Sequence, residues 1–238
     1  MKAITPETTV GEIVRAMPIR SRIFEKLGID YCCGGKKPLN EVCRGKGLDA
    51  ATVIAMLAAL EGAPESSSAN PDTMSLSELC DHIERAHHNY LREELPRLDF
   101  MSRKVAAVHG ADEARLLEVR AIFEAFSVKM TSHTKEEEEI VFPKIRQLEN
   151  AGQDKAEVAS GLKDILSRLE SEHDGAGAAL ERFRELTDNY TPPADACNTY
   201  RALLDGLASI ERDMHQHVHK ENNILFPRAI EAEKAVAV

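Results

Sequence analysis

The sequence predicts an all-α protein, in which a small helical domain is followed by an antiparallel up-down-up-down four-helix bundle. The 238-residue chain is rich in helix-forming residues, its aromatic fraction is only 5%, and it has no tryptophan. It shows no alternating pattern typical of strands, and four long amphipathic stretches follow a segment rich in glycine, proline and serine. Long helices joined by short turns pack as a bundle.

The leading part of the chain, residues 1–61, is expected to form a domain of short helices. Helix-like patterns cover residues 9–17, 19–27, 39–44 and 49–60. Between the second and third lies DYCCGGKKP, whose glycines and proline predict a turn. The segment GAPESSSANPDTMS, residues 62–75, has lost the large aliphatic residues and is predicted to be a linker.

The remaining residues, 76–238, contain the four stretches of the predicted bundle. They cover residues 76–109, 112–150, 153–189 and 195–232, with the short separators HGAD, NAGQ and YTPPAD. Pro96 lies inside the first stretch, where a proline removes a backbone hydrogen bond and is expected to kink the helix.

Composition and charge exclude several classes of function. With 30 Lys+Arg against 40 Asp+Glu the formal charge is −10, and no dense basic stripe offsets it, so nucleic acid is not an expected partner. The longest apolar run, Ala50 to Leu60, is about half of what a bilayer crossing needs, and residues 1–11 lack the apolar core of a signal peptide. We therefore expect a cytoplasmic protein without membrane contact, whose five cysteines are reduced.

A twelve-residue phrase occurs twice, 84 residues apart. HTKEEEEIVFPK begins at His133 and HVHKENNILFPR begins at His217, and both fit His-x-x-x-Glu-x-x-Ile-x-Phe-Pro-Lys/Arg. His88 lies 45 residues before His133, and His173 lies 44 before His217. The bundle is thus predicted to be a duplicated αα-hairpin that offers two similar sets of His, His and Glu.

The helical spacing places these polar residues on buried seams. Steps of three and four residues connect the members of each seam, as in a bundle core. The seams contain Val119, Phe123, Phe126, Met130, His133, Glu137 and Ile140; Leu162, Leu166, Leu169, His173, Ala176, Leu180 and Phe183; and Leu203, Leu207, Ile210, Met214, His217, Glu221 and Ile224. Two ionised glutamates inside an apolar bundle repel each other and cost several kcal/mol unless a cation lies between them.

A pair of metal ions meets this requirement, because no lysine or arginine interrupts these seams at that level. Imidazole and carboxylate ligands without a thiolate favour iron or manganese over structural zinc. We predict a di-iron centre in which Glu137 and Glu221 bridge two ions. The expected pairing is His88 with His133 on one ion, and His173 with His217 on the other.

Two alternatives concern neighbouring histidines. In the first helix, Leu79 and Ile83 place His87 on the seam, whereas Leu91 and Leu95 place His88 there, so that periodicity alone does not choose between them. His215 and His219 form a second pair at helical spacing. They lie about 200° around the helix from His217, and we expect them on an outer face towards water.

The chain resembles the hemerythrin-like proteins, and more closely the Repair of Iron Centers (RIC) di-iron family of bacteria. The motifs that carry this resemblance are DYCCGG, HHNYLREELP, VAAVHG, SHTKEEEEIVFP, ESEHDGAG, TPPADACNTY and HKENNILFPRA. The resemblance implies a hemerythrin-like bundle behind an ScdA-type N-terminal domain. It also implies an oxo- or hydroxo-bridged pair of non-haem irons with bridging carboxylates, and it selects His88 over His87. The implied ligands are His88, His133, Glu137, His173, His217 and Glu221.

The same resemblance implies repair of iron-sulfur clusters damaged by nitrosative or oxidative stress, through iron delivery or reactions of nitric oxide. Damaged iron-sulfur proteins would be the partners, NO or O₂ the small ligands, and the chain a monomer or weak homodimer. The alternatives are a hemerythrin-type carrier or sensor of O₂ or NO, and an enzyme that reduces NO. A ferritin-like oxidase fits less well, because those bundles use Glu-x-x-His pairs.

The cysteines fall into two groups. Cys32 and Cys33 close only a strained disulfide ring, and the adjacent Gly34 and Gly35 suggest a flexible arm with two candidate catalytic thiols. By analogy with the family this arm passes electrons or receives iron at the bundle. The others, Cys43, Cys80 and Cys197, are expected to be buried small hydrophobic residues. His109 is interpreted as a histidine at a helix C-terminus.

Overall fold

The computed structural model describes residues 3–60, 70–150 and 161–234, and helices dominate all three ranges. Within these ranges strand-type pairing is limited to an isolated antiparallel bridge between Thr9 and Pro38. The predicted all-α class is therefore confirmed. Among the described helices, none combines the length and the apolar character that a membrane crossing requires.

The small domain packs its short helices around one core. The elements are α1 (Val10–Ala16), η1 (Pro18–Arg20), α2 (Ser21–Leu27), η2 (Cys33–Lys36), α3 (Leu39–Gly45) and α4 (Ala50–Ala58). Thr9 and Glu12 form a capping box at the start of α1, and Gly28, at φ 62°, ends α2 in the left-handed region that glycine adopts without strain. The buried Phe24 and Tyr31 are members of this core, with tilted rings whose centroids lie 6.2 Å apart.

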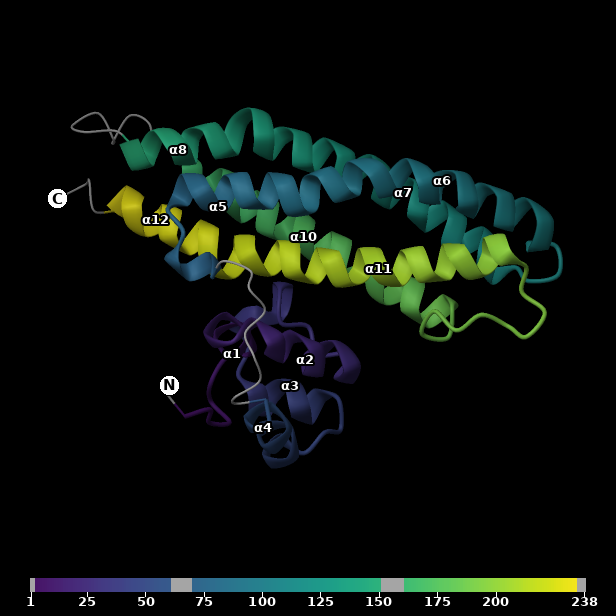
Figure 1. Ribbon diagram of the computed structural model, residues 1–238, viewed down its shortest axis with the longest axis horizontal. Coiled ribbons are helices and arrows are strands. Elements are labelled where there is room, and N and C mark those ends of the chain that lie inside the picture. The colour runs from purple at the N-terminus through teal and green to yellow at the C-terminus, as the bar shows by residue number, and fades with distance from the viewer. Residues whose placement is uncertain (1–2, 61–69, 151–160, 235–238) are drawn as a thin grey trace.

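Four helical rods form the bundle, and their connections alternate between its two ends (Figure 1). The first rod consists of α5 (Leu76–Ile83), η4 (Glu84–His88) and α6 (Asn89–His109), and the second of α7 (Arg115–Glu136), η5 (Glu137–Val141) and α8 (Phe142–Asn150). The third rod is α10 (Leu162–Leu186), and the last consists of α11 (Asn198–Lys220), η6 (Glu221–Leu225) and α12 (Phe226–Lys234). The short η3 (Pro71–Thr73) and the Ser75 N-cap precede them, and α6 continues through Pro96. The last residue of the expected first domain (61), part of the expected linker (62–69) and part of the third stretch (153–160) lie outside the described residues.

Three of the four rods contain a π-helical turn in the middle, and all three turns include candidate ligands. In each turn a backbone N–H bonds the carbonyl five residues earlier: Asn89 to Glu84, Phe142 to Glu137, and Phe226 to Glu221. Such turns are rare in proteins, and those that occur are often found at functional sites. Two of the turns are followed, two residues later, by a proline, Pro143 or Pro227. A proline has no backbone N–H to donate to the helix.

The extra residue in each π turn changes which side chains face the core. In the first rod Ile83 and Leu91 are both buried, although they belong to two different α-helical registers, because η4 lies between them. Both registers read from the sequence are therefore correct, each on its own side of the turn. In the second rod the expectation for Ile140 is wrong. η5 turns Ile140 outward, 47% exposed, and buries Val141 instead.

The bundle core consists of two hydrophobic clusters with a polar layer between them. One cluster combines α6, α7, α10 and α11 around residues such as Phe123 and Leu207. The other combines α5, α8, the start of α10 and α12 around residues such as Leu79 and Phe226. The candidate ligands lie in the sequence between the members of the two clusters on every rod. Apolar packing on both sides therefore shields this layer from water.

The small domain packs against the bundle beside α11, as Figure 1 shows in purple. Asn223, in the π turn η6, donates a hydrogen bond from Nδ2 to the carbonyl of Cys32 at 3.0 Å. Lys36 forms an ion pair with Glu170 on α10 at 3.0 Å. The Tyr31 ring lies 5.5 Å from the ring of His219. These contacts fix the CCGG segment on the bundle.

Candidate metal centre

Six polar side chains from the four rods meet in the layer between the two hydrophobic clusters. They come from η4, α7, η5, α10, α11 and η6, and all are at most 2% exposed: His88, His133, Glu137, His173, His217 and Glu221. The structure therefore brings together the whole set that the repeat and the seams predicted. Their role as metal ligands stays a prediction, because the geometry alone establishes proximity.

The histidines are paired differently from the expected arrangement. His88 Nε2 lies 3.1 Å from His217 Nε2, and His133 Nε2 lies 2.8 Å from His173 Nε2. The expected pairs, His88 with His133 and His173 with His217, are therefore wrong. The rod with η4 and α6 contacts both α7 and α11, and α7 also contacts α10, so contacts between rods alone admit either pairing and the positions of the side chains decide it.

Each carboxylate faces both histidine pairs. Glu137 Oε2 lies 3.4 Å from His88 Nε2, and its Oε1 lies 3.4 Å from His133 Nε2. Glu221 repeats this arrangement, with Oε1 2.9 Å from His217 and Oε2 3.3 Å from His173. Two groups of four potential ligands result, and both contain Glu137 and Glu221.

The electrostatics of this layer favour positive charge next to the two buried carboxylates. Burial and the neighbouring carboxylate oppose ionisation of Glu137, yet the contacts with His133 and His88 keep its pKa below the usual range, and the pKa of Glu221 is lowered further. Burial disfavours protonated His88 and His133, but the two glutamates outweigh it and raise the histidine pKa values to about 10 and about 9. Protons on imidazole thus balance the buried carboxylates.

The donor set fits divalent metal ions. Both oxygens of Glu137 and Oε2 of Glu221 are buried without a hydrogen-bond partner among the described residues. Two nitrogens bound at about 2.1 Å to one ion, at right angles, would be about 3 Å apart, which is close to both Nε2 to Nε2 distances. Four imidazole nitrogens and four carboxylate oxygens, without sulfur, surround the space between the pairs. The layer therefore has a donor set that a metal site could use.

Sequence reasoning missed the residues that hold the far nitrogens of the histidines. Glu138 Oε1 lies 2.9 Å from His88 Nδ1, and Asn222 Oδ1 lies 2.8 Å from His173 Nδ1. Glu172 Oε2 lies 2.8 Å from His133 Nδ1. Glu138 and Asn222 each follow a candidate bridging glutamate, so the repeat itself contained the signal for them. Such partners orient metal-bound histidines and fix their tautomers.

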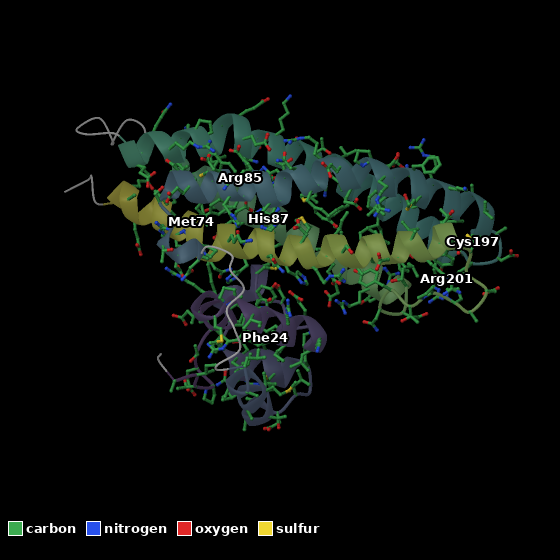
Figure 2. The ribbon with its side chains drawn as sticks, viewed as in Figure 1. Phe24, Met74, Arg85, His87, Cys197 and Arg201 are labelled. Carbon is green, nitrogen blue, oxygen red and sulfur yellow. The ribbon has the colours of Figure 1, made fainter. Side chains whose placement is uncertain are left out.

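A second buried polar cluster lies beside His217. His87 stacks on the His217 ring at 5.2 Å, and its Nδ1 lies 2.7 Å from Asp213 Oδ1. Lys220 Nζ lies 2.6 Å from His87 Nε2. Burial lowers the pKa of His87 to about 4 and that of Lys220 to about 8, which leaves a neutral imidazole that accepts from an ammonium at neutral pH. Figure 2 shows His87 in the middle of the bundle.

The second histidine pair of the last rod does not face water as expected. His219 is 6% exposed, and its Nδ1 lies 3.4 Å from the carbonyl oxygen of Tyr31. The His215 ring lies 5.8 Å from the ring of Tyr31. The small domain covers this face of α11, which the periodicity of one helix cannot reveal. Burial lowers the pKa of His219 to about 4.

The segment expected to be a thiol arm lies docked on the bundle. Cys32 is 4% exposed and belongs to the bundle's hydrophobic cluster, with Cys33 packed against it. A Cβ added to Gly177 would lie 3.7 Å from Cys33 Sγ, so the thiol is next to α10 one helical turn beyond His173. The hydrogen bond to Cys33, burial and Asp30 hold the pKa of Cys32 well above its usual range.

The other cysteines differ among themselves. Cys43 and Cys80 are buried, as expected, but Cys197 is exposed. Cys197 is the N-cap residue of α11 at the end of the bundle, where Figure 2 labels it. Its Sγ lies 3.4 Å from Nε2 of His109, the last residue of α6. The expectation of burial failed because a helix cap has no hydrophobic neighbour on its open side.

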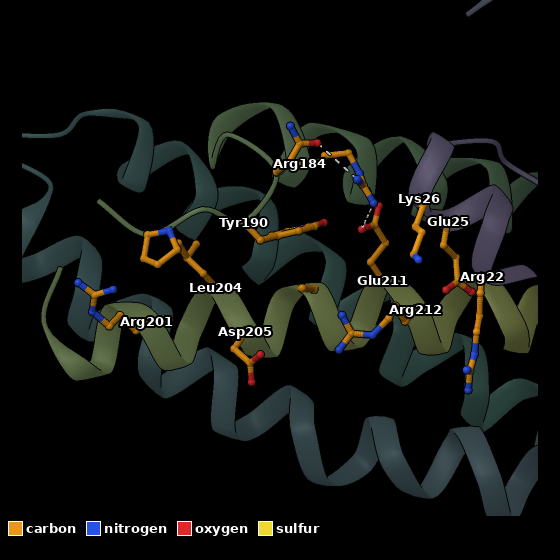
Figure 3. Close-up of a pocket in the computed structure, with 13 residues that line it drawn as sticks. Arg22, Glu25, Lys26, Arg184, Tyr190, Arg201, Leu204, Asp205, Glu211 and Arg212 are labelled. Carbon is orange, nitrogen blue, oxygen red and sulfur yellow. Dashed lines mark hydrogen bonds and ion pairs between the residues drawn. The ribbon is translucent and has the colours of Figure 1, made fainter. Parts of the chain in front are cut away.

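A cleft of about 780 Å³ lies outside this layer, between α2, the end of α10 and α11 (Figure 3). Its wall includes the ion pair of Arg184 with the buried Glu211, joined at 2.6 Å. Arg22 and Lys26 of the small domain also line it. None of the six candidate ligands contributes to this cleft. The buried layer is thus a separate feature of the molecule.

Comparison with known proteins matches both parts of the chain. Residues 80–229 match the hemerythrin HHE cation binding domain, and residues 6–61 match ScdA_N, a domain of unknown function (DUF542). The iron-sulfur cluster repair protein YtfE of Enterobacter sp. (strain 638) is 39% identical over 94% of this chain and 97% of its own. The iron-sulfur cluster repair protein ScdA of Staphylococcus haemolyticus is 35% identical over 94% of this chain and 98% of its own.

Proposed function

Because the chain belongs to the hemerythrin-like family of the iron-sulfur cluster repair proteins YtfE and ScdA, we propose that it repairs damaged iron-sulfur clusters with a pair of non-haem irons. The ligands would be His88 and His217 for one iron and His133 and His173 for the other. Glu137 and Glu221 would bridge the two. NO and oxidants are the proposed agents of the damage.

The observation that carries this proposal is the shared orientation of the two buried glutamates. Each offers one oxygen to each histidine pair, at distances between 2.9 and 3.4 Å. A single cation would leave one histidine pair without a metal ion, and the carboxylate oxygens that face this pair without a cation. Two ions use all six side chains, and they neutralise carboxylates that otherwise have unpaired oxygens.

The ligand types favour iron as the resident metal. Structural zinc prefers closed tetrahedral sites, commonly with cysteine, whereas imidazole and carboxylate sites with more positions suit iron. Two adjacent irons supply redox equivalents and open positions for small ligands such as NO or O₂. Three of the histidines would be held in place by hydrogen bonds that their Nδ1–H groups donate to Glu138, Glu172 and Asn222.

Iron can also be the cargo that this protein delivers. Nitrogen and oxygen ligands hold ferrous ion less tightly than the thiolates of a cluster do. Cys32 and Cys33, with Asp30, form a second group of potential ligands on the small domain. Cys33 lies beside α10, one turn beyond His173, which supports a role of these thiols in receiving iron or passing electrons.

Matched glutamate variants test this function. Glu137→Gln removes one proposed bridge, whereas Glu139→Gln makes the same change at an exposed position of the same π turn. Anaerobically purified chain should contain about two irons and reactivate an NO-treated iron-sulfur enzyme. Glu137→Gln should lose iron and repair, and Glu139→Gln should retain both. Zinc as the resident metal, or equal losses in the two variants, would contradict the proposal; catalytic consumption of NO without repair would favour an NO reductase.

A further inference from the structure

The two histidine pairs differ in the hydrogen-bond partners of their Nδ1 atoms. In the pair His133 and His173, both Nδ1 atoms have a side-chain partner, Glu172 and Asn222, each at 2.8 Å. In the other pair, only His88 has one, Glu138 at 2.9 Å. The Nδ1 atom of His217 is buried and has no hydrogen-bond partner among the described residues.

This difference has a direct consequence for metal affinity. A hydrogen-bond acceptor at Nδ1 fixes the tautomer that leaves Nε2 free to bind, and it makes the imidazole a stronger donor. Loss of one such partner typically lowers metal affinity about 10-fold to 100-fold. His217 faces the flat ring of His87 at 5.2 Å and 4° instead, and stacking supplies no acceptor in the plane of the imidazole. The pair containing His217 is therefore the weaker ligand pair.

Charge adds to the difference in the same direction. Lys220 is adjacent to Glu221 in the chain, and its ammonium lies 2.6 Å from His87, whose ring covers His217. Asp213 binds the opposite nitrogen of His87 at 2.7 Å and offsets part of this charge. The cation near the other pair, Arg168, is more exposed and is already paired with Glu172 at 2.6 Å. A buried ammonium repels a metal ion more than a solvated, paired guanidinium does.

We infer that His88 and His217 form the weaker of the two metal positions, from which iron is released to an acceptor, whereas His133 and His173 retain theirs. The inference rests on the proposed ligand set. Release is an exchange of ligands: donor atoms of the acceptor replace the nitrogens of His88 and His217 and the oxygens of the two glutamates. Each electron pair stays on the ligand that leaves, and ferrous iron keeps its oxidation state. Lys220 acts in this step as a positioning residue, through His87 and through its charge.

The kinetics of iron release test whether the two metal positions differ in strength. The full chain is loaded anaerobically with two equivalents of Fe²⁺ and mixed with excess ferrozine, and coloured chelate is followed over time. Two phases of one iron each are expected, with rates that differ about 10-fold or more. Lys220→Gln removes the charge and keeps a donor for His87, and it should slow only the fast phase. Lys220→Arg should preserve the fast phase, and the exposed Lys135→Gln should change neither.

A variant at the other pair provides the complementary measurement. Asn222→Ala removes the acceptor at His173 Nδ1, so it should accelerate only the slow phase and bring the two rates together. Release of both irons in one phase by the unchanged protein, or a Lys220→Gln variant with an unaltered fast phase, would overturn the inference while two bound irons still support the proposed function. Fewer than two irons bound to the unchanged protein would instead contradict the proposed ligand set.

Discussion

Asn223 occupies the space that a side chain at residue 35 would need, so that Gly35 and Asn223 join the small domain to the π turn η6 of the bundle. A Cβ on Gly35 would overlap the Asn223 side chain, and one on Gly11 would lie 2.6 Å from Asn223 Oδ1. Asn223 lies two residues after Glu221, in the same π turn. The position of the CCGG segment is therefore tied to the turn that carries a candidate bridging glutamate.

Gly35→Ala should loosen the small domain from the bundle. Overpacking costs about 1–3 kcal/mol, and a loss of about 1.4 kcal/mol corresponds to a tenfold change in an opening equilibrium. Alkylation of the buried Cys32, followed by mass spectrometry, should become about tenfold faster. The exposed Cys197 serves as the internal reference, and Gly45→Ala, where a Cβ meets nothing within 4 Å, as the control. Unchanged labelling of Cys32 would argue against this contact as the anchor.

The double variant Cys32→Ser and Cys33→Ser should keep its metal and lose repair. All six candidate ligands are in the bundle, so the iron content and the visible spectrum should stay as in the unchanged chain. Serine at neutral pH does not replace a thiolate as a ligand or as an electron donor. Repair of an NO-treated cluster enzyme is the measurement, and Cys197→Ser is the matched control. Full repair by the double variant would leave the bundle as the sole active unit.

Metal binding should release about two protons per chain at pH 7 to 8. In the metal-free protein the pKa values of His88 and His133 are raised to about 10 and about 9, so both imidazoles are protonated there. Glu137 and Glu221 have lowered pKa values and carry no proton to release. A metal ion requires neutral imidazole. Titration calorimetry in buffers of different ionisation enthalpy gives the number, and release near zero would show that these carboxylates are not paired with imidazolium.

Glu149 should stabilise the bundle in a pH-dependent way. Its Oε1 accepts from the backbone N–H of Leu76 at 2.8 Å and its Oε2 from that of Ser77 at 3.0 Å, at the start of α5. Burial raises the pKa of Glu149, but a hydrogen bond from Ser77 Oγ at 2.6 Å and these two backbone bonds outweigh it and lower the pKa. Because the folded pKa lies below the unfolded value of about 4.3, the contribution is complete above that value and is lost as the pH falls through the folded pKa.

The corresponding test is urea unfolding of metal-free Glu149→Gln. At pH 7 the free energy of unfolding should fall by about 1 kcal/mol, as for loss of a helix cap. The difference should shrink below about pH 4. The exposed Glu93→Gln should change little at either pH. A loss that persists unchanged in acid would show that packing of Glu149, and not its charge, stabilises α5.

The sequence was sufficient for the fold class, because bundle helices reveal themselves through local periodicity. It also pointed to residues that meet in the polar layer, because duplication repeats His133 and Glu137 as His217 and Glu221. It even carried a trace of the π turn in the first rod. The two conflicting registers around His87 and His88 are the pattern that an inserted residue produces, and the turn resolves them.

Only the tertiary structure decided which side chains meet across the rods and which faces are covered. The pairing of His88 with His217 depends on how the side chains of neighbouring rods are placed, and a single helix contains no information about its neighbour. His219 and Cys32 are buried because the small domain lies on α11, a contact between residues that are far apart in the chain. Periodicity reports the faces of one element, whereas burial and metal geometry arise from the packing of several.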